Sequence, residues 1–184
     1  EARKKLNLDV TKTYLLFGAA GGTKDRRKGF DLLIDFLNQK LSKNEKIHLL
    51  LFGITNQKDL NNLKLPITNF GSISYDDHKK LSLIYSASNL TLFPSKLEAF
   101  GQVGSESLAC KTPVITFKNS GPEDMIEHKK NGYISDYKSN ESLAEGILWC
   151  LEHFVNSEDK IREFAINKFD QDIFIKNYLN FLKR

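Results

Sequence analysis

Residues 93–106 read FPSKLEAFGQVGSE and hold the clearest transition from a strand to a helix in the sequence. Phe93 closes a short apolar run, Pro94 ends the strand that this run predicts, and a helix begins near Gly101. A strand that passes through a loop directly into a helix is the repeating unit of α/β proteins. We therefore expect further units of this kind on both sides of it.

Short, continuously apolar runs recur along the chain, each bounded by Gly, Pro, Asn or Ser, as buried parallel strands tend to be. They lie at residues 14–17, 47–52, 67–70, 90–93, 114–117 and, more weakly, 133–134. Apolar residues at helical spacing separate them, and residues 139–154, 157–168 and 172–182 predict C-terminal helices. The pattern predicts an α/β fold, a Rossmann-like doubly wound parallel sheet of about six strands followed by helices.

The composition, 40% hydrophobic and 27% charged over 184 residues, fits one soluble domain spanning residues 1–184. The net charge of +4 suits a small anionic ligand, but no basic stripe carries interleaved aromatic residues, so nucleic acid is not an expected partner. No apolar run approaches the roughly 20 residues of a membrane-spanning helix. We expect a cytoplasmic protein, or one peripheral to the cytoplasmic face of a membrane, with Cys110 and Cys150 reduced and buried.

The loop and helix start within residues 93–106 carry the clearest chemistry. Backbone N–H groups at the start of a helix near Gly101 form an anion site, and the glycine lets a ligand approach closely. Glu98 lies before the helix and Glu106 about one turn inside it, and carboxylates accept hydrogen bonds from sugar hydroxyls. An anion site flanked by two carboxylates suits a sugar, a diphosphate and a ribose in a row. The histidines show no metal-ligand spacing, so no metal ion is expected.

Four stretches in order resemble the retaining GT-B glycosyltransferases of family four, called "group 1". Residues 97–115, LEAFGQVGSESLACKTPVI, resemble the E-x7-E region of these enzymes, and residues 17–37, FGAAGGTKDRRKGFDLLIDFL, their first strand and phosphate loop. Residues 70–95, FGSISYDDHKKLSLIYSASNLTLFPS, resemble the approach to the E-x7-E region, and residues 121–134, GPEDMIEHKKNGYI, the segment after it. The resemblance implies one half of a GT-B fold, the C-terminal donor-binding domain, with the N-terminal acceptor domain absent from this chain.

The resemblance also implies roles for single residues. Glu98 would hold the donor sugar and Lys28 the diphosphate, as the two residues closest to the chemistry. Glu106 would bind the ribose, with Ser72 and Ile73 bordering the base. Backbone N–H groups would face the sugar and diphosphate at Phe100, Gly101, Gln102 and Val103.

Two positions depart from the family pattern. Ala19 stands where the family often has an arginine, and we expect Arg27 or Lys24 to supply the missing cation to the diphosphate. Lys111 stands where the family usually has a glycine after the helix, so we expect a left-handed or altered helix end there.

Weaker signals have simpler explanations. Asp170 and Asp172 match the DxD of metal-dependent transferases, but they lie between two predicted helices and suit helix capping. Asp76 and Asp77 similarly predict a helix start, and His128 is expected on the surface. Glu123, or the backbone of residues 120–121, is a further candidate to approach the donor sugar.

The resemblance implies a hexosyltransferase-like enzyme that moves a sugar from a UDP- or GDP-linked donor, without cofactor or metal, to a glycan or lipid-linked acceptor, as in polysaccharide biosynthesis. The acceptor would be bound through the absent domain, so we expect this domain alone to bind donor without efficient turnover. Because the chain begins with Glu, we expect it to be a piece of a longer protein. Two alternatives remain open: a non-catalytic nucleotide-sugar-binding or scaffold subunit, and a GT-B nucleotide-sugar epimerase.

Overall fold

The computed structural model describes residues 1–74, 76–154 and 158–182. Its centre is a parallel sheet of six strands in the order β3-β2-β1-β4-β5-β6. The strands are β1 (Thr13–Gly18), β2 (Ile47–Phe52), β3 (Ile67–Asn69), β4 (Leu90–Phe93), β5 (Val114–Phe117) and β6 (Gly132–Ser135). The predicted Rossmann-like fold is therefore confirmed, with strand ends within two residues of those expected.

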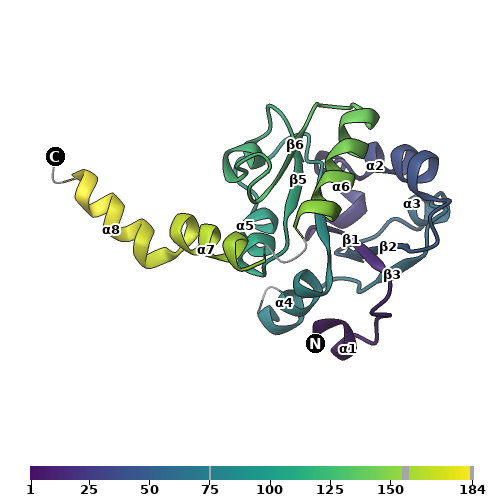
Figure 1. Ribbon diagram of the computed structural model, residues 1–184, viewed down its shortest axis with the longest axis horizontal. Helices are drawn as coiled ribbons and strands as arrows, with labels where there is room; N and C mark the ends of the chain where they lie inside the picture. Colours follow the sequence, from purple (N-terminus) through teal and green to yellow (C-terminus); the bar gives the residue numbers. More distant parts are fainter. Residues whose placement is uncertain (75, 155–157, 183–184) are drawn as a thin grey trace.

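The helices lie on both faces of the sheet (Figure 1). They are α1 (Ala2–Lys5), α2 (Phe30–Phe36), α3 (Gln57–Asn61), α4 (His78–Ala87), α5 (Gln102–Ala109), α6 (Asn140–His153), α7 (Glu158–Phe169) and α8 (Gln171–Leu182). Short 3₁₀ turns span Gly22–Lys24, Arg26–Lys28 and Gly121–Met125, and a π-helical turn, Leu37–Leu41, follows α2. The predicted start of the second C-terminal helix, at residue 157, lies outside the described residues.

Alternate residues of the central strands point to opposite faces of the sheet, as the period of a strand requires. On one face, Leu15 and Leu49 lie in a cluster that also holds buried residues of α2 and α6. On the other face, Leu16 and Leu50 pack in a cluster with Tyr85 of α4. Both faces are covered, which explains why the strands appear in the sequence as unbroken apolar runs.

Most local predictions about helix ends are confirmed. Asp77 caps α4 by accepting a hydrogen bond from the Lys80 N–H (3.0 Å). Asp170 accepts from the N–H of Asp172 (3.0 Å) at the start of α8, so this carboxylate does act as a cap. Lys111 adopts φ 69°, the left-handed conformation expected after α5. Cys150 is buried as expected, but Cys110 is only half-buried, because it lies near the exposed end of α5.

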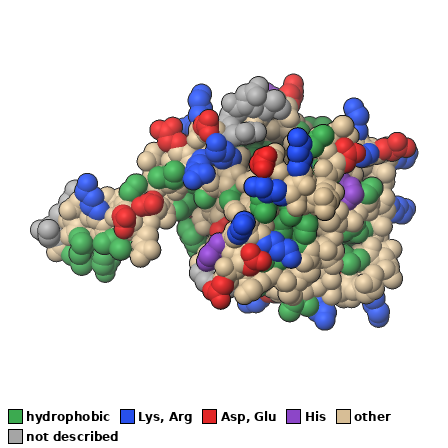
Figure 2. Space-filling view, turned by 90° about the horizontal axis from the view of Figure 1, so that it is seen from below, with side chains coloured by type: hydrophobic (Ala, Val, Ile, Leu, Met, Phe, Trp, Pro, Cys, Tyr) green, Lys and Arg blue, Asp and Glu red, His purple; other side chains and the backbone are tan. Residues whose placement is uncertain are grey.

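After α7 the chain leaves the body of the molecule, and α8 forms an arm that extends away from the sheet (Figure 1). Helix α7 packs against α5 and buries Ile161 and Ala165. Helix α8 has no buried residue within its described part, and hydrophobic side chains gather on its surface (Figure 2). Among the described residues, no helix is long and apolar enough to cross a membrane.

Candidate functional site

Strand order reverses between β1 and β4, because β1 continues to β2 on one side and pairs with β4 on the other. In open α/β sheets, ligands bind beyond the carboxyl ends of the strands at such a point. A cavity of about 990 Å³ lies there. Its lining includes every residue to which the family resemblance assigns a donor contact, together with Arg27: Arg27, Lys28, Ser72, Ile73, Glu98, Phe100, Gly101, Gln102, Val103 and Glu106. The fold thus brings the predicted residues together around one cavity, while the role of each residue stays a prediction.

The loop after β1 and the loop after β4 are joined by backbone contacts. Gly29 has φ 74°, and a Cβ at this position would lie 1.9 Å from the carbonyl oxygen of Pro94. Beside it, the Lys96 N–H donates to the Arg27 carbonyl oxygen (2.7 Å). Only glycine allows this left-handed turn with so close an approach. The contact fixes Lys28, in the first loop, relative to Glu98, in the second.

Lys28 and Glu98 form an ion pair inside the cavity. The Lys28 Nζ donates to Oε2 of Glu98, and the side chains are 23% and 16% exposed. Both side chains are largely withdrawn from water, and each offers the other an oppositely charged partner within the cavity. The pair places an amine and a carboxyl group at the cavity wall, the first suited to a phosphate and the second to sugar hydroxyls.

The start of α5 lies against this ion pair. Gly101 precedes the helix with φ 82°, and a Cβ there would lie 2.4 Å from the Phe93 ring and 2.9 Å from Cγ of Glu98. The first N–H groups of a helix have no acceptor within that helix. Two of these groups belong to Gln102 and Val103, which line the cavity, so the helix start predicted as an anion site lies at the cavity wall. Anion binding there stays a prediction.

Glu106 lies one turn further along α5. Its Oε2 accepts a hydrogen bond from the hydroxyl of Tyr85 (2.8 Å), which comes from α4. Burial, and then the charge of Glu106, raise the pKa of Tyr85 well above its ordinary value, so this phenol stays protonated and can only donate to the carboxylate. Tyr85 was not predicted as a site residue. Its place in an apolar helical pattern indicates burial, and nothing in the sequence indicates which group its hydroxyl contacts.

Of the cations considered as substitutes for the missing arginine at Ala19, Arg27 lines the cavity and Lys24 is not among its lining residues. Arg27 donates to both carboxylate oxygens of Asp25 (3.0 and 2.8 Å). These hydrogen bonds lower the pKa of Asp25 and raise that of Arg27. The Arg27 side chain is 68% exposed, and its guanidinium retains N–H groups that a ligand could reach.

The segment after β5 supports the site from outside. Glu123 accepts a hydrogen bond from the Asn119 N–H (2.5 Å) and is not among the residues that line the cavity. Gly121 packs against the loop after β4, since a Cβ there would lie 2.1 Å from the Glu98 carbonyl oxygen. His128 is exposed, as predicted, and its Nδ1 accepts from the Ile134 N–H (3.1 Å).

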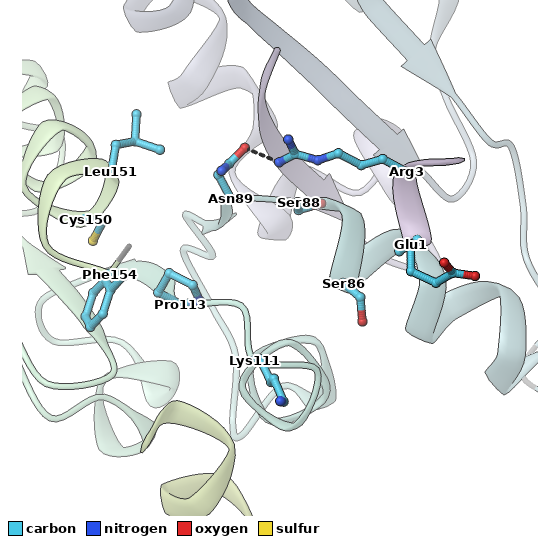
Figure 3. A pocket seen from close by; sticks show the side chains of 11 residues that line it. Glu1, Arg3, Ser86, Ser88, Asn89, Lys111, Pro113, Cys150, Leu151 and Phe154 are labelled. Carbon is cyan, nitrogen blue, oxygen red and sulfur yellow. Dashed lines mark hydrogen bonds between the residues drawn. The ribbon is translucent and has the colours of Figure 1, made fainter. Parts of the chain in front are cut away.

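A smaller cavity, of about 340 Å³, lies at the opposite edge of the sheet, near the amino ends of β4 and β5 (Figure 3). The two cationic side chains that line it, Arg3 and Lys111, already bond to other groups of the protein. Arg3 donates to the Asn89 side chain (2.7 Å) and to the Ala87 carbonyl oxygen (2.8 Å), and Lys111 pairs with Asp159. These contacts tie the first residues and α7 to the body of the molecule. The larger cavity is the candidate donor site because the predicted site residues line it.

Residues 1–168 match the family described as "Glycosyl transferases group 1". This chain belongs to that family. Among curated proteins, an uncharacterized glycosyltransferase of Methanocaldococcus jannaschii is 27% identical over 95% of this chain and 43% of its own length. The poly(ribitol-phosphate) alpha-N-acetylglucosaminyltransferase of Staphylococcus aureus is 30% identical over 50% of this chain and 19% of its own length.

Among solved structures, Anabaena HepE in complex with UDP superposes with a TM-score of 0.80 at 20% identity, over 98% of this chain and 51% of that one. At this identity the likeness shows the fold. The first curated relatives matched by this chain are less than half covered by it, at 43% and 44% of their length. The family thus accounts for the sheet and its helices, and the relatives have a further half beyond what this chain matches.

Proposed function

We propose that this chain is the donor-binding half of a retaining glycosyltransferase, which moves a sugar from a UDP- or GDP-linked donor to a glycan or lipid-linked acceptor. The observation that carries the proposal is one cavity that holds the Lys28–Glu98 pair, the start of α5 and Glu106. Two similar proteins support it. Anabaena HepE was solved with UDP, and the S. aureus relative is an alpha-N-acetylglucosaminyltransferase.

The charges of the cavity suit the arrival of a nucleotide sugar. A diphosphate competes with Glu98 for the Lys28 ammonium, and the freed carboxylate can then accept hydrogen bonds from sugar hydroxyls. When the bond between the sugar and the diphosphate breaks, negative charge develops on the leaving oxygen. Lys28 and the N–H groups at the start of α5 stabilise that charge without a metal ion.

Retention of configuration requires the acceptor to attack from the side that the diphosphate leaves. In the proposed mechanism an oxygen of the leaving phosphate accepts the proton of the acceptor hydroxyl on that same face. Glu98 then serves to hold the sugar, and no protein nucleophile is needed. The acceptor itself is bound by the half that the relatives possess beyond this chain, and we expect little sugar transfer by this chain alone.

Calorimetric titration of the chain with UDP, GDP, ADP and their common sugar conjugates tests the proposal. We expect saturable binding of one nucleotide series, with Glu106→Ala raising the dissociation constant about 10- to 100-fold, as loss of hydrogen bonds to a charged group implies. Glu127→Ala, which removes an exposed carboxylate outside the cavity, is the matched control and is expected to bind normally. Absence of binding, or equal binding by wild type and Glu106→Ala, would overturn the proposal.

A further inference from the structure

Tyr85 contacts Glu106, one of the two proposed ligand-binding carboxylates, from the buried side of the cavity wall. Its hydroxyl donates to Oε2 of Glu106 over 2.8 Å, and this contact joins two helices, α4 and α5. Within the described residues, Oε1 of Glu106 has no protein donor. Glu106 also lines the cavity, whereas Tyr85 is buried beneath it.

The ring of Tyr85 is fixed on several sides. The side chain is 1% exposed, and Phe52 of β2 packs edge-on against it with ring centroids 5.8 Å apart. Its backbone is held as well, because Thr112 donates its hydroxyl to the Tyr85 carbonyl oxygen (2.7 Å). A ring held in this way can place its hydroxyl in few positions, so the position of Oε2 is set by the protein core.

A glutamate at a helix surface ordinarily samples several side-chain conformations, and ordering it on binding costs affinity. Bonding Oε2 to a buried phenol removes most of that freedom before any ligand arrives. A buried hydroxyl needs a partner in any case, and donation to a carboxylate gives a stronger bond than donation to a neutral acceptor. Cys110, one turn further along α5, is the neighbouring titratable side chain on this face, and it is a neutral thiol because burial raises its pKa.

We propose that Tyr85 is a positioning residue: by holding Oε2 of Glu106, it presents Oε1 to the adjacent hydroxyls of the donor's ribose and makes the site prefer ribonucleotides over 2′-deoxyribonucleotides. Tyr85 itself contacts neither donor nor reacting atoms. It acts through Glu106, and its effect is confined to ligands that carry the hydroxyls. This inference rests on the proposed function.

The test compares Tyr85→Phe with Tyr14→Phe in the 184-residue chain. Both substitutions remove one phenol hydroxyl from the same buried cluster, but Tyr14 lies at the amino end of β1, away from Glu106. The ligands are the nucleoside diphosphate that the wild type binds best, among UDP, GDP and ADP, and its 2′-deoxy form. Thermal unfolding of each variant is measured alongside, so that a change in binding is compared between folded proteins.

We expect the wild type to bind the ribonucleotide about tenfold more tightly than the 2′-deoxy form, as one hydrogen bond to a charged group implies. Tyr85→Phe should weaken ribonucleotide binding about five- to tenfold and change 2′-deoxynucleotide binding less than about twofold, so that the preference is largely lost. Tyr14→Phe should leave the preference intact. If Tyr85 had only a structural role, Tyr85→Phe would weaken the binding of both nucleotides equally, and that result would overturn the inference.

A double-mutant cycle gives a second readout that does not depend on the stability of a single variant. In a Glu106→Ala background, Tyr85→Phe should have no further effect on ribonucleotide binding, because the carboxylate through which it acts is gone. Additive losses would contradict the proposal. If the wild type binds none of the nucleotides, the proposed function fails and the inference with it. If it binds them and Tyr85→Phe binds equally well, the inference alone is overturned.

Discussion

Leu49 in β2 and Leu179 in α8 carry the same side chain in opposite surroundings. Leu49 is 0% exposed in the middle of the sheet, whereas Leu179 is 50% exposed on the arm that α8 forms. Helix α7 lies between these extremes, since it buries Ile161 and its Phe169 ring packs edge-on against Phe100 of the site, with centroids 5.7 Å apart. Both α7 and α8 have the apolar spacing of a helix, but α7 packs on the body of the molecule and α8 does not. Helical spacing thus predicts that a helix forms, but not how much of its surface is buried.

The largest expected effect is on stability and comes from truncating the buried leucine of this pair. Leu49→Ala should lower the free energy of unfolding by about 2–5 kcal/mol, because it leaves a cavity in a closely packed core. Leu179→Ala should lower it by less than about 0.5 kcal/mol, since its side chain is half exposed. Urea unfolding of both variants measures the difference. Equal losses would show that the apolar surface of α8 is covered in solution.

Two loop glycines with similar backbone conformations also have opposite surroundings. Gly29 and Gly71 both have positive φ, 74° and 68°, but a Cβ at Gly71 meets nothing within 4 Å, whereas one at Gly29 meets Pro94. Both alanine variants should lose about 1–2 kcal/mol for the left-handed backbone. Gly29→Ala should lose about 1–3 kcal/mol more, because the two site loops must separate. Urea unfolding of the two variants measures this difference. Equal losses in the free energy of unfolding would mean that the two loops separate at no cost.

Lys111 offers a smaller effect of opposite sign. Its φ of 69° disfavours any side chain, so Lys111→Gly should raise the free energy of unfolding by about 1 kcal/mol. Lys111 also pairs with Asp159 of α7, but that carboxylate is exposed, and exposed ion pairs contribute little. Asp159→Ala is the control for the lost ion pair and should leave the unfolding midpoint nearly unchanged. A destabilised Lys111→Gly would indicate that the ion pair outweighs the backbone strain.

The smallest expected effect is on pH dependence. Burial lowers the pKa of His48, which lies beside Thr68 (3.1 Å), below its ordinary value of 6.5. The unfolded chain therefore binds a proton there at higher pH than the folded protein does. Stability should be fully present above about pH 6.5 and decline as the pH falls below that value.

His48→Gln should make this decline shallower in thermal unfolding between pH 7 and pH 5. The pKa of His128 is lowered as well, by the partial burial of this otherwise exposed side chain and then by the charge of Lys129, so its replacement should act in the same direction. Parallel pH profiles for wild type and His48→Gln would show that this ring does not contribute to the decline.

The inner strands β1, β2, β4 and β5 could be predicted because they are buried on both faces, so each appears as a nearly continuous apolar run. Strand ends were less certain where hydrogen bonding continues past the strand. The Phe70 N–H still donates to the Leu51 carbonyl oxygen (2.8 Å), but the left-handed Gly71 turns the chain, and β3 ends at Asn69. The short helix α3 and the π-helical turn at Leu37–Leu41 were not predicted, and nothing in the local sequence explains the π-helical turn.

The membership of the site could be predicted because its residues follow strands whose carboxyl ends meet at the switch point. The pairings within the site could not be predicted. Lys28 meets Glu98 across 70 residues of chain, and Tyr85 meets Glu106 across 21. Such contacts depend on how α2, α4 and α5 pack on the sheet, which spacing along the sequence does not encode.

The order of the strands also bears on how the protein behaves at high concentration. The two strands with an unpaired edge, β3 and β6, are only three and four residues long, while the long strands β1 and β2 are paired on both sides. Pro66, which cannot donate a hydrogen bond, stands directly before β3. Short edges of this kind offer little template for strand addition by another chain. The sheet is therefore protected against edge-to-edge aggregation while its carboxyl ends remain open to a ligand.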